Sequence, residues 1–136
     1  MNLDRALAVS AAGMNTQSAR LRVVAENLAN RDSTGIAPDS EPYRRRTITF
    51  AQQLDRRIGV QMPVVKRIGT DPGAFPQRHD PGHPAADANG YVRMPNVTSL
   101  IELFDMREAQ RSFNANLAVM ETTRTMLMRS IEALRQ

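Results

Sequence analysis

Cysteine and tryptophan are absent from this sequence, and aromatic rings are scarce, with four Phe and two Tyr among 136 residues. Without cysteine the chain can form neither a disulfide nor a thiolate metal site. So few rings do not make a stacking platform for single-stranded nucleic acid. No stretch approaches the roughly 18 apolar residues that a transmembrane helix needs, so no transmembrane segment is expected.

Proline and glycine are missing from most of both ends. All eight Pro and six of the seven Gly lie between Gly35 and Pro95. Because these residues interrupt helices, the sequence predicts a mainly α fold in three segments. Residues 1–30 and 96–136 are expected to be long helices that form one helical domain, and residues 31–95 a small β-rich module with extended Pro/Gly loops.

Charge is moderate, since the formal net charge is +4, and residues 31–95 carry most of it. The basic residues do not form a helical stripe, although an Arg-rich nucleic-acid-binding module stays open as the alternative function. The first residues lack a basic stretch followed by an apolar run, so no cleaved secretory signal is expected.

Both ends carry apolar residues at the alternating three-and-four spacing of helices that pack lengthwise. This pattern predicts a coiled-coil-like pair, and an ordinary antiparallel hairpin in a globular bundle would produce it too. Small residues such as Ala11, Gly13 and Ala118 beside the repeat indicate a second contact face on each helix. A bare pair of such helices is expected to be marginally stable, so further subunits are expected as neighbours. The predicted assembly positions, called the apolar seam below, are Leu3, Leu7, Met14, Leu21, Val24, Leu28, Leu103, Met106, Phe113, Leu117, Met120, Leu127, Ile131 and Leu134.

The middle of the chain has strand and turn signals. Strands are expected over 42–50 and 60–68, a turn at 71–73, and a turn at Asn89-Gly90 that leads into a short strand. The run Arg44-Arg45-Arg46 is expected to be split by the pleat of its strand, and a phosphate clamp is the alternative. At the helix ends, Asn30 or Gly35 is expected in the left-handed conformation, and Ser99 with Glu102 as a capping box.

His79 and His83, with Asp80 and Asp87 nearby, are the one cluster that suggests a metal. Pro81, Gly82 and Pro84 prevent the helix that would bring the two rings together, and a third ligand is not evident. No phosphate loop or nucleophile spacing occurs either. We therefore expect no catalytic residue, metal, cofactor or small-molecule substrate, and no enzyme.

Several motifs in fixed order resemble the proximal rod proteins of the bacterial flagellar basal body, of the FlgC type, within the family of flagellar rod and hook axial proteins. The motifs are Ser10-Ala11-Ala12-Gly13-Met14, Glu26-Asn27-Leu28-Ala29-Asn30, Pro42-Tyr43-Arg44-Arg45, Asp80-Pro81-Gly82-His83-Pro84, Gly90-Tyr91-Val92, Met94-Pro95-Asn96-Val97, and Arg111-Ser112-Phe113 with Ala115-Asn116. The positions that carry the resemblance are Asn27, Asn30, Tyr43, Arg44, Pro81, His83, Pro84, Gly90, Tyr91, Pro95, Asn96, Arg111 and Asn116.

This resemblance implies a structural subunit of the rod that transmits motor torque and supports motility. It implies export through the flagellar type III apparatus without signal cleavage, followed by helical assembly in the periplasm. The implied partners are the chain itself and other flagellar rod proteins, with no nucleic acid.

Overall fold

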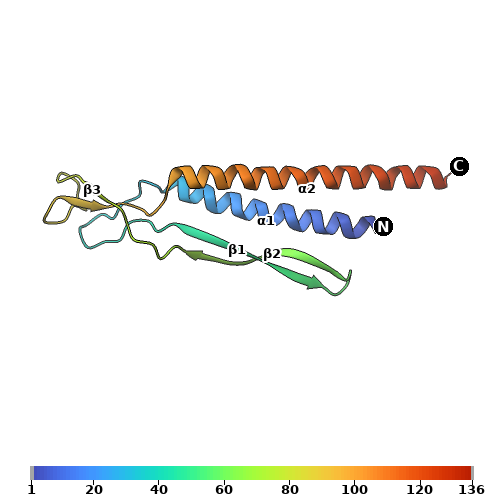
Figure 1. The fold of residues 1–136 in the computed structure, drawn as a ribbon, viewed down its shortest axis with the longest axis horizontal. Coiled ribbons are helices and arrows are strands. Elements are labelled where there is room, and N and C mark those ends of the chain that lie inside the picture. The colour runs from blue at the N-terminus through green and yellow to red at the C-terminus, as the bar shows by residue number, and fades with distance from the viewer. Residues whose placement is uncertain (1, 136) are drawn as a thin grey trace. The chain divides into compact units, whose positions relative to one another are not determined.

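The structure is a computed structural model that describes residues 2–135. In chain order, a small β module separates two long helices, which confirms the predicted fold class (Figure 1). The elements in chain order are α1 (Leu3–Ala29), β1 (Arg46–Asp55), β2 (Val60–Thr70), β3 (Gln77–His79), β4 (Tyr91–Arg93) and α2 (Ser99–Leu134). No helix in this described range is long and apolar enough to cross a membrane.

The helix ends differ from two local predictions. Gly59 and Gly90 are the residues with positive φ in the described range, so neither Asn30 nor Gly35 takes the left-handed conformation. Instead the backbone and side-chain amides of Asn30 both donate to the Glu26 carbonyl, at 3.1 and 2.9 Å, and so complete the last turn of α1. The capping box is also wrong, because the Glu102 carboxylate accepts from Asn27 and Arg45 rather than from the Ser99 amide.

The four strands form two separate two-stranded sheets, β1 with β2 and β3 with β4. In the second sheet the strands are antiparallel, with Arg78 opposite Val92. Glycine permits the turn before β4, where Gly90 has a φ of 82°. The predicted strand at 42–50 begins only at Arg46, so Arg44 and Arg45 precede the ladder and their side chains are free of its pleat.

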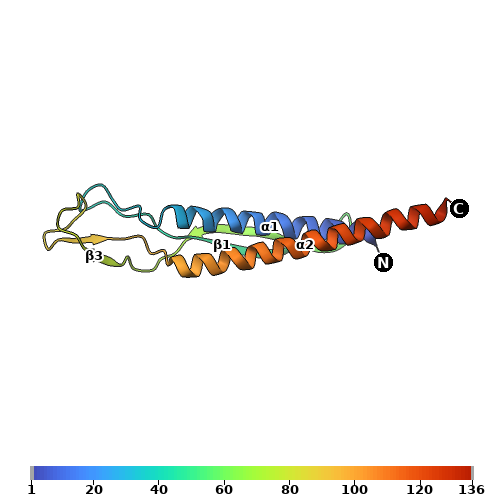
Figure 2. The same ribbon diagram turned by 90° about the horizontal axis from the view of Figure 1, so that it is seen from above.

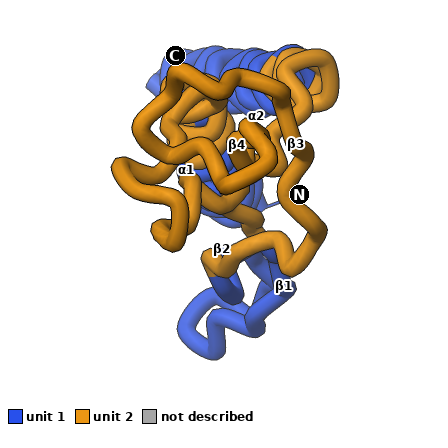
Figure 3. The backbone as a smooth tube through the Cα atoms, turned by 90° about the vertical axis from the view of Figure 1, so that its left-hand side faces the viewer, with its two compact units in different colours: residues 1–21, 49–67, 107–136 blue, residues 22–48, 68–106 orange. Residues whose placement is uncertain are grey.

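The chain divides into two compact units, coloured separately in Figure 3. Unit 1 contains residues 1–21, 49–67 and 107–136, and unit 2 contains residues 22–48 and 68–106. The division passes through α1, α2, β1 and β2. The grouping of residues 1–30 with 96–136 as one helical domain stays a prediction.

In unit 1 the first part of α1 lies beside the last part of α2, in opposite directions (Figures 1 and 2). Gly13 faces Asn116, and Arg20 forms an ion pair with Glu108 at 3.4 Å, which fixes the antiparallel register. The buried residues of these segments are small or polar. They are Ser10, Gly13, Thr16, Ala109 and Thr123.

Unit 2 contains the end of α1, the start of α2, and the β3–β4 sheet. Its buried apolar side chains include Val23, Val24, Ala85 and Val92, with Val92 fully buried. Asn27 and Glu102 are buried in the same unit, at 1% and 0% exposure. Polar and even charged groups are therefore part of this core.

Candidate functional site

The apolar seam of α2 is displaced in the single chain. Glu102, Ala109 and Thr123 are buried, and their spacings of seven and fourteen residues place them on one face of α2, one position before the heptad position that Leu103 and Leu117 share. The predicted Leu103, Leu117 and Ile131 are exposed by 48%, 36% and 46%, and Leu134 by 87%. For these four residues, a seam within one chain is wrong, because α2 turns smaller or polar residues toward α1.

The rest of the seam lies closer to the expected face. Val24 is buried, and the others are half-buried: Leu3, Leu7, Met14, Leu21, Leu28, Met106, Phe113, Met120 and Leu127. Whether any of the fourteen positions contacts another subunit remains a prediction.

Close approach of the helices in unit 1 depends on Gly13. A Cβ atom at this position would lie 2.7 Å from Oδ1 of Asn116, which is shorter than van der Waals contact allows. The Asn116 amide donates to the Ser112 carbonyl at 2.9 Å and so stays on its own helix. Because small residues occupy this contact, the large apolar side chains of the two helix segments point away from it.

An apolar groove lies in unit 1 between the start of α1 and α2, with a volume of about 360 Å³. Among the described residues, no charged side chain lines it. The lining residues are Leu3, Ala6, Ala118, Val119, Thr122, Thr123 and Met126. Val119 and Met126 are each about half exposed, so the groove offers apolar surface to solvent in the single chain.

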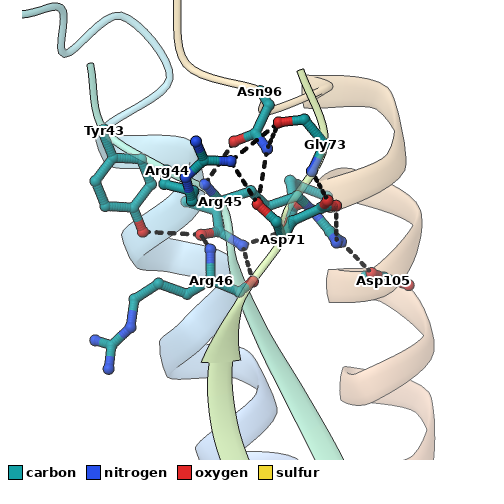
Figure 4. Close-up of polar contacts among 10 residues, drawn as sticks. Tyr43, Arg44, Arg45, Arg46, Asp71, Gly73, Asn96 and Asp105 are labelled. Atoms are coloured by element: carbon teal, nitrogen blue, oxygen red, sulfur yellow. Dashed lines mark hydrogen bonds and ion pairs between the residues drawn. The ribbon is translucent and has the colours of Figure 1, made fainter. Parts of the chain in front are cut away.

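The principal polar feature of unit 2 is a network of side chains between the end of α1, the segment before β1, the loop after β2 and the start of α2 (Figure 4). We call it the polar junction. Its members are Asn27, Tyr43, Arg44, Arg45, Arg46, Asp71, Gly73, Asn96, Glu102 and Asp105.

Arg45 is the cation at the centre of this junction. Its guanidinium pairs with Glu102, with Asp105 at 3.6 Å and with Asp71 at 3.7 Å. Burial acts to lower the Arg45 pKa, but the hydrogen bond and charge of Glu102, with the charges of Asp105 and Asp71, raise it overall. Arg45 therefore stays protonated beside a fully buried carboxylate.

Asn27 uses its whole side-chain amide. Its nitrogen donates to the Arg46 carbonyl at 2.9 Å and to the Glu102 carboxylate at 3.1 Å. Its oxygen accepts from the Tyr43 hydroxyl and the Arg46 amide, both at 2.8 Å. Burial raises the pKa of the Tyr43 hydroxyl, and the nearby Glu26 carboxylate raises it further, so the hydroxyl remains a donor at neutral pH.

Arg44 and Asn96 hold the loop after β2. Arg44 donates to the carbonyls of Asp71 and Gly73, at 2.9 and 3.0 Å, and its guanidinium carbon lies 4.2 Å from the centre of the Phe75 ring. The Asn96 nitrogen donates to the same two carbonyls, while its oxygen accepts from the Arg45 amide at 2.7 Å. Inside the loop, the Asp71 carboxylate accepts from the Gly73 amide, which confirms the predicted turn.

The arginine run is thus engaged inside the chain. Arg44 binds loop carbonyls, Arg45 binds carboxylates, and Arg46 pairs with Glu26 at 2.6 Å. A phosphate would have to displace these partners. The geometry does not favour the phosphate clamp that the sequence left open.

The two histidines contribute to the loops of unit 2. His79 packs its ring edge-on against Tyr91, with ring centres 5.0 Å apart. His83 lies 3.3 Å from the Thr34 hydroxyl through Nε2, and its Nδ1 accepts from the Ala85 amide at 3.0 Å. Both ring nitrogens of His83 are therefore used in protein contacts.

The structure brings four of the resemblance positions together, since Asn27, Tyr43, Arg44 and Asn96 all belong to the polar junction. The others lie elsewhere. Asn30 closes α1, Asn116 faces Gly13, and Gly90 is buried where a Cβ atom would lie 2.9 Å from the Pro81 ring. Of the rest, Pro95 is buried, Tyr91 and His83 make the contacts given above, and Pro84 and Arg111 are exposed.

Sequence reasoning missed Glu102 and Arg45 as structural partners. Glu102 directly precedes the predicted seam residue Leu103 and was interpreted as a capping group. Arg45 was interpreted as one of three equivalent arginines. A signal for Glu102 did exist, because its seven-residue spacing to Ala109 places it on the inner face of α2. Nothing in the local sequence pairs it with a residue 57 positions away.

Comparison with known proteins gives a consistent result. Residues 88–133 match a family described as "Flagellar basal body rod FlgEFG protein C-terminal". A protein of Agrobacterium fabrum named "Flagellar basal-body rod protein FlgC" is 50% identical over 133 residues, which cover 98% of this chain and 96% of the relative. Proteins of the same name from Salmonella typhimurium and Bacillus subtilis are 38% and 33% identical, over 90% and 97% of this chain and 91% and 98% of their own lengths.

Proposed function

The chain belongs to the FlgC family of flagellar basal-body rod proteins, and from this membership we propose how its surfaces serve the rod. It is a structural subunit of that rod and is located in the flagellar basal body. We propose that the exposed apolar residues of α2 and the half-buried apolar residues of α1 are covered by further copies of the chain and by other rod proteins, and that the assembly transmits motor torque without enzymatic activity.

The distribution of apolar side chains supports this proposal. Among the described residues, five hydrophobic side chains are buried and fifteen large ones are exposed. Single exposed apolar residues are ordinary on a protein surface, but ten of these fifteen lie on α2, and such a concentration on one helix is typical of surfaces that other proteins cover. The apolar groove in unit 1 adds uncharged surface of the same kind.

We also propose that the chain leaves the cytoplasm through the flagellar type III export apparatus, without signal cleavage, and assembles in the periplasm. The small core supports this route, because few buried apolar contacts must be lost when the subunit unfolds for passage. The absence of cysteine is compatible with it, since no disulfide can form before assembly.

The experiment that tests the rod function is deletion of the gene and complementation with a tagged copy. We expect the deletion strain to lack external filaments and motility, and the tagged chain to co-purify with isolated basal bodies. Mass spectrometry of the assembled chain should find its first residues intact. Filaments of normal length and number in the deletion strain would contradict the proposal.

A further inference from the structure

A fully buried carboxylate stands at the start of α2. Glu102 has 0% exposure, and its two oxygens are taken by Arg45 and Asn27. A buried carboxylate without partners costs several kcal/mol, which is comparable to the whole stability of a small unit. The first turns of α2 can therefore occupy this place only when Arg45 and Asn27 are already there.

Asn27 imposes a similar requirement on α1, because the end of this helix can occupy its place only when the partners of the Asn27 amide are present. Its amide bonds four groups in a site with 1% exposure, and these groups come from Tyr43, Arg46 and Glu102. Removing any one of these elements leaves buried donors or acceptors unpaired. The end of α1, the segment before β1 and the start of α2 are therefore expected to form together.

Apolar packing alone would fix this arrangement less strictly. The inner face of α2 repeats small or polar residues every seven positions, so a shift of one heptad would exchange similar side chains. The buried charge of Glu102 permits only one register of the helices, because any other register separates this carboxylate from the Arg45 guanidinium.

We propose that the polar junction is a clasp that holds residues 22–29 of α1 against residues 99–106 of α2 in the unassembled subunit, with Arg45 as the counter-ion on which this pairing depends. The boundary between slowly and rapidly exchanging amides in the free subunit then falls inside both helices. The inference goes beyond the role in the rod, because it concerns the subunit before assembly.

Amide hydrogen exchange on the full-length chain, shown to be monomeric by sedimentation, tests the clasp. We expect amides of residues 23–28 to exchange at least about tenfold more slowly than those of residues 7–16. Residues 103–106 should likewise be slower than residues 117–127. Equal rates in the two parts of each helix would overturn the proposal.

Variants test the counter-ion. Arg45→Met should accelerate exchange at residues 23–28 and 103–106 about tenfold or more, because it leaves Glu102 buried and unpaired. Arg22→Met is the matched control, since Arg22 is an exposed arginine on the same part of α1, and it should change nothing there. Unchanged protection in Arg45→Met would overturn the role of Arg45.

A double variant separates charge from packing. Arg45→Met with Glu102→Gln should return exchange to within about threefold of the original chain, because the neutral amide keeps its contact with Asn27. If the double variant exchanges as fast as Arg45→Met alone, the counter-ion role is wrong. Should Arg45→Met unfold the β3–β4 sheet as well, Glu102→Gln alone carries the test, with about threefold faster exchange at residues 23–28 expected and no change contradicting it.

Discussion

Unit 1 contains most of both helices and unit 2 a shorter part of each, and the two units are stabilised differently. Among the described residues, unit 1 buries one hydrophobic side chain, Ala109, whereas unit 2 buries Val23, Val24, Ala85 and Val92. The helix contacts given for unit 1 are a glycine against an asparagine and an exposed ion pair. Those of unit 2 include a buried ion pair and a saturated amide.

This difference indicates that one part of a helix pair can stabilise the fold of the single chain while the other part remains available for assembly. Exposed ion pairs such as Arg20–Glu108 contribute little, so unit 1 has few interactions of its own that offset the entropy of ordering its helices. Unit 2 has a small core of its own. Large apolar side chains of unit 1, including Leu117, Val119 and Met126, are then available to other subunits.

The largest effect is expected from Leu117→Asp, which should abolish rod assembly. In the single chain Leu117 is 36% exposed, so the isolated subunit should lose no more than about 1 kcal/mol. In the rod a carboxylate against apolar neighbours costs several kcal/mol, and the cost recurs at every subunit. Motility and the subunit content of isolated basal bodies measure this effect.

Arg135→Asp is the control, since it introduces the same carboxylate near the end of the chain and off the seam. It should affect assembly far less. Secretion of both variants into the medium should be normal, because an unfolded chain forms no seam. Rods of normal composition with Leu117→Asp would mean that this face of α2 is not covered.

Asn27→Leu should have the next largest effect, and it acts on unit 2. The change leaves the Tyr43 hydroxyl, the Arg46 amide and one oxygen of the Glu102 carboxylate without their Asn27 partner, so we expect the free energy of unfolding to fall by about 3 kcal/mol. Urea unfolding of the isolated subunit, followed by circular dichroism, measures it.

Asn15→Leu provides the comparison, because Asn15 is exposed on the same helix in unit 1. It should change the free energy of unfolding by no more than about 0.5 kcal/mol. Equal losses in the two variants would remove the distinction between the units.

The sequence predicted the long helices and both turns well, since periodicity and glycine placement are local properties. Ser99–Leu134 and Leu3–Ala29 lie within the predicted ranges, and Gly90 takes the positive φ that its turn needs. On α2, Met106, Phe113, Met120 and Leu127 are half-buried, whereas the alternate positions of the seam, such as Leu103, lie one residue after the buried ones. A hydrophobic pattern identifies the apolar residues of a helix. The prediction assumed in addition that the largest of them face the partner helix.

The polar junction could not be predicted, because its members are far apart in sequence. Arg45 pairs with Glu102 over 57 positions, and Asn27 with Glu102 over 75. Each residue had a plausible local role, as phosphate ligand, cap or helix end. Only the tertiary structure shows that these charged groups neutralise one another. For that reason the sequence pattern did not identify Glu102 as a buried charge.

A double-mutant cycle at Gly13 and Asn116 should show a smaller effect in unit 1. Gly13→Ala alone should be nearly neutral, because a helix gain of about 1 kcal/mol is offset when the methyl group displaces Asn116 and its hydrogen bond to Ser112. In an Asn116→Ala background the same change should stabilise the subunit by about 1 kcal/mol. Thermal unfolding of the four chains gives the coupling, and additive effects would contradict the close approach.

The smallest effect is expected at the turn between β1 and β2, in unit 1. The pKa of Asp55 is lowered, first by the hydrogen bond from the Arg57 amide at 2.9 Å and further by the Arg57 side chain. A carboxylate with a lowered pKa in the folded state stabilises the fold above its unfolded pKa of about 3.9, and this contribution is lost as the pH falls through the folded value.

Below about pH 4, exchange of the Arg57 and Gly59 amides should therefore accelerate beyond its intrinsic pH dependence, while the junction amides of unit 2 keep their protection. Asp55→Asn should remove this acid-dependent step and leave exchange at neutral pH nearly unchanged, because an asparagine oxygen still accepts from the Arg57 amide. Since the Arg57 side chain is exposed, solvent screens the interaction and the step should be slight. An equal acid-dependent step in Asp55→Asn would assign it to another carboxylate, and its appearance at residues 23–28 would mean that the two units do not respond separately.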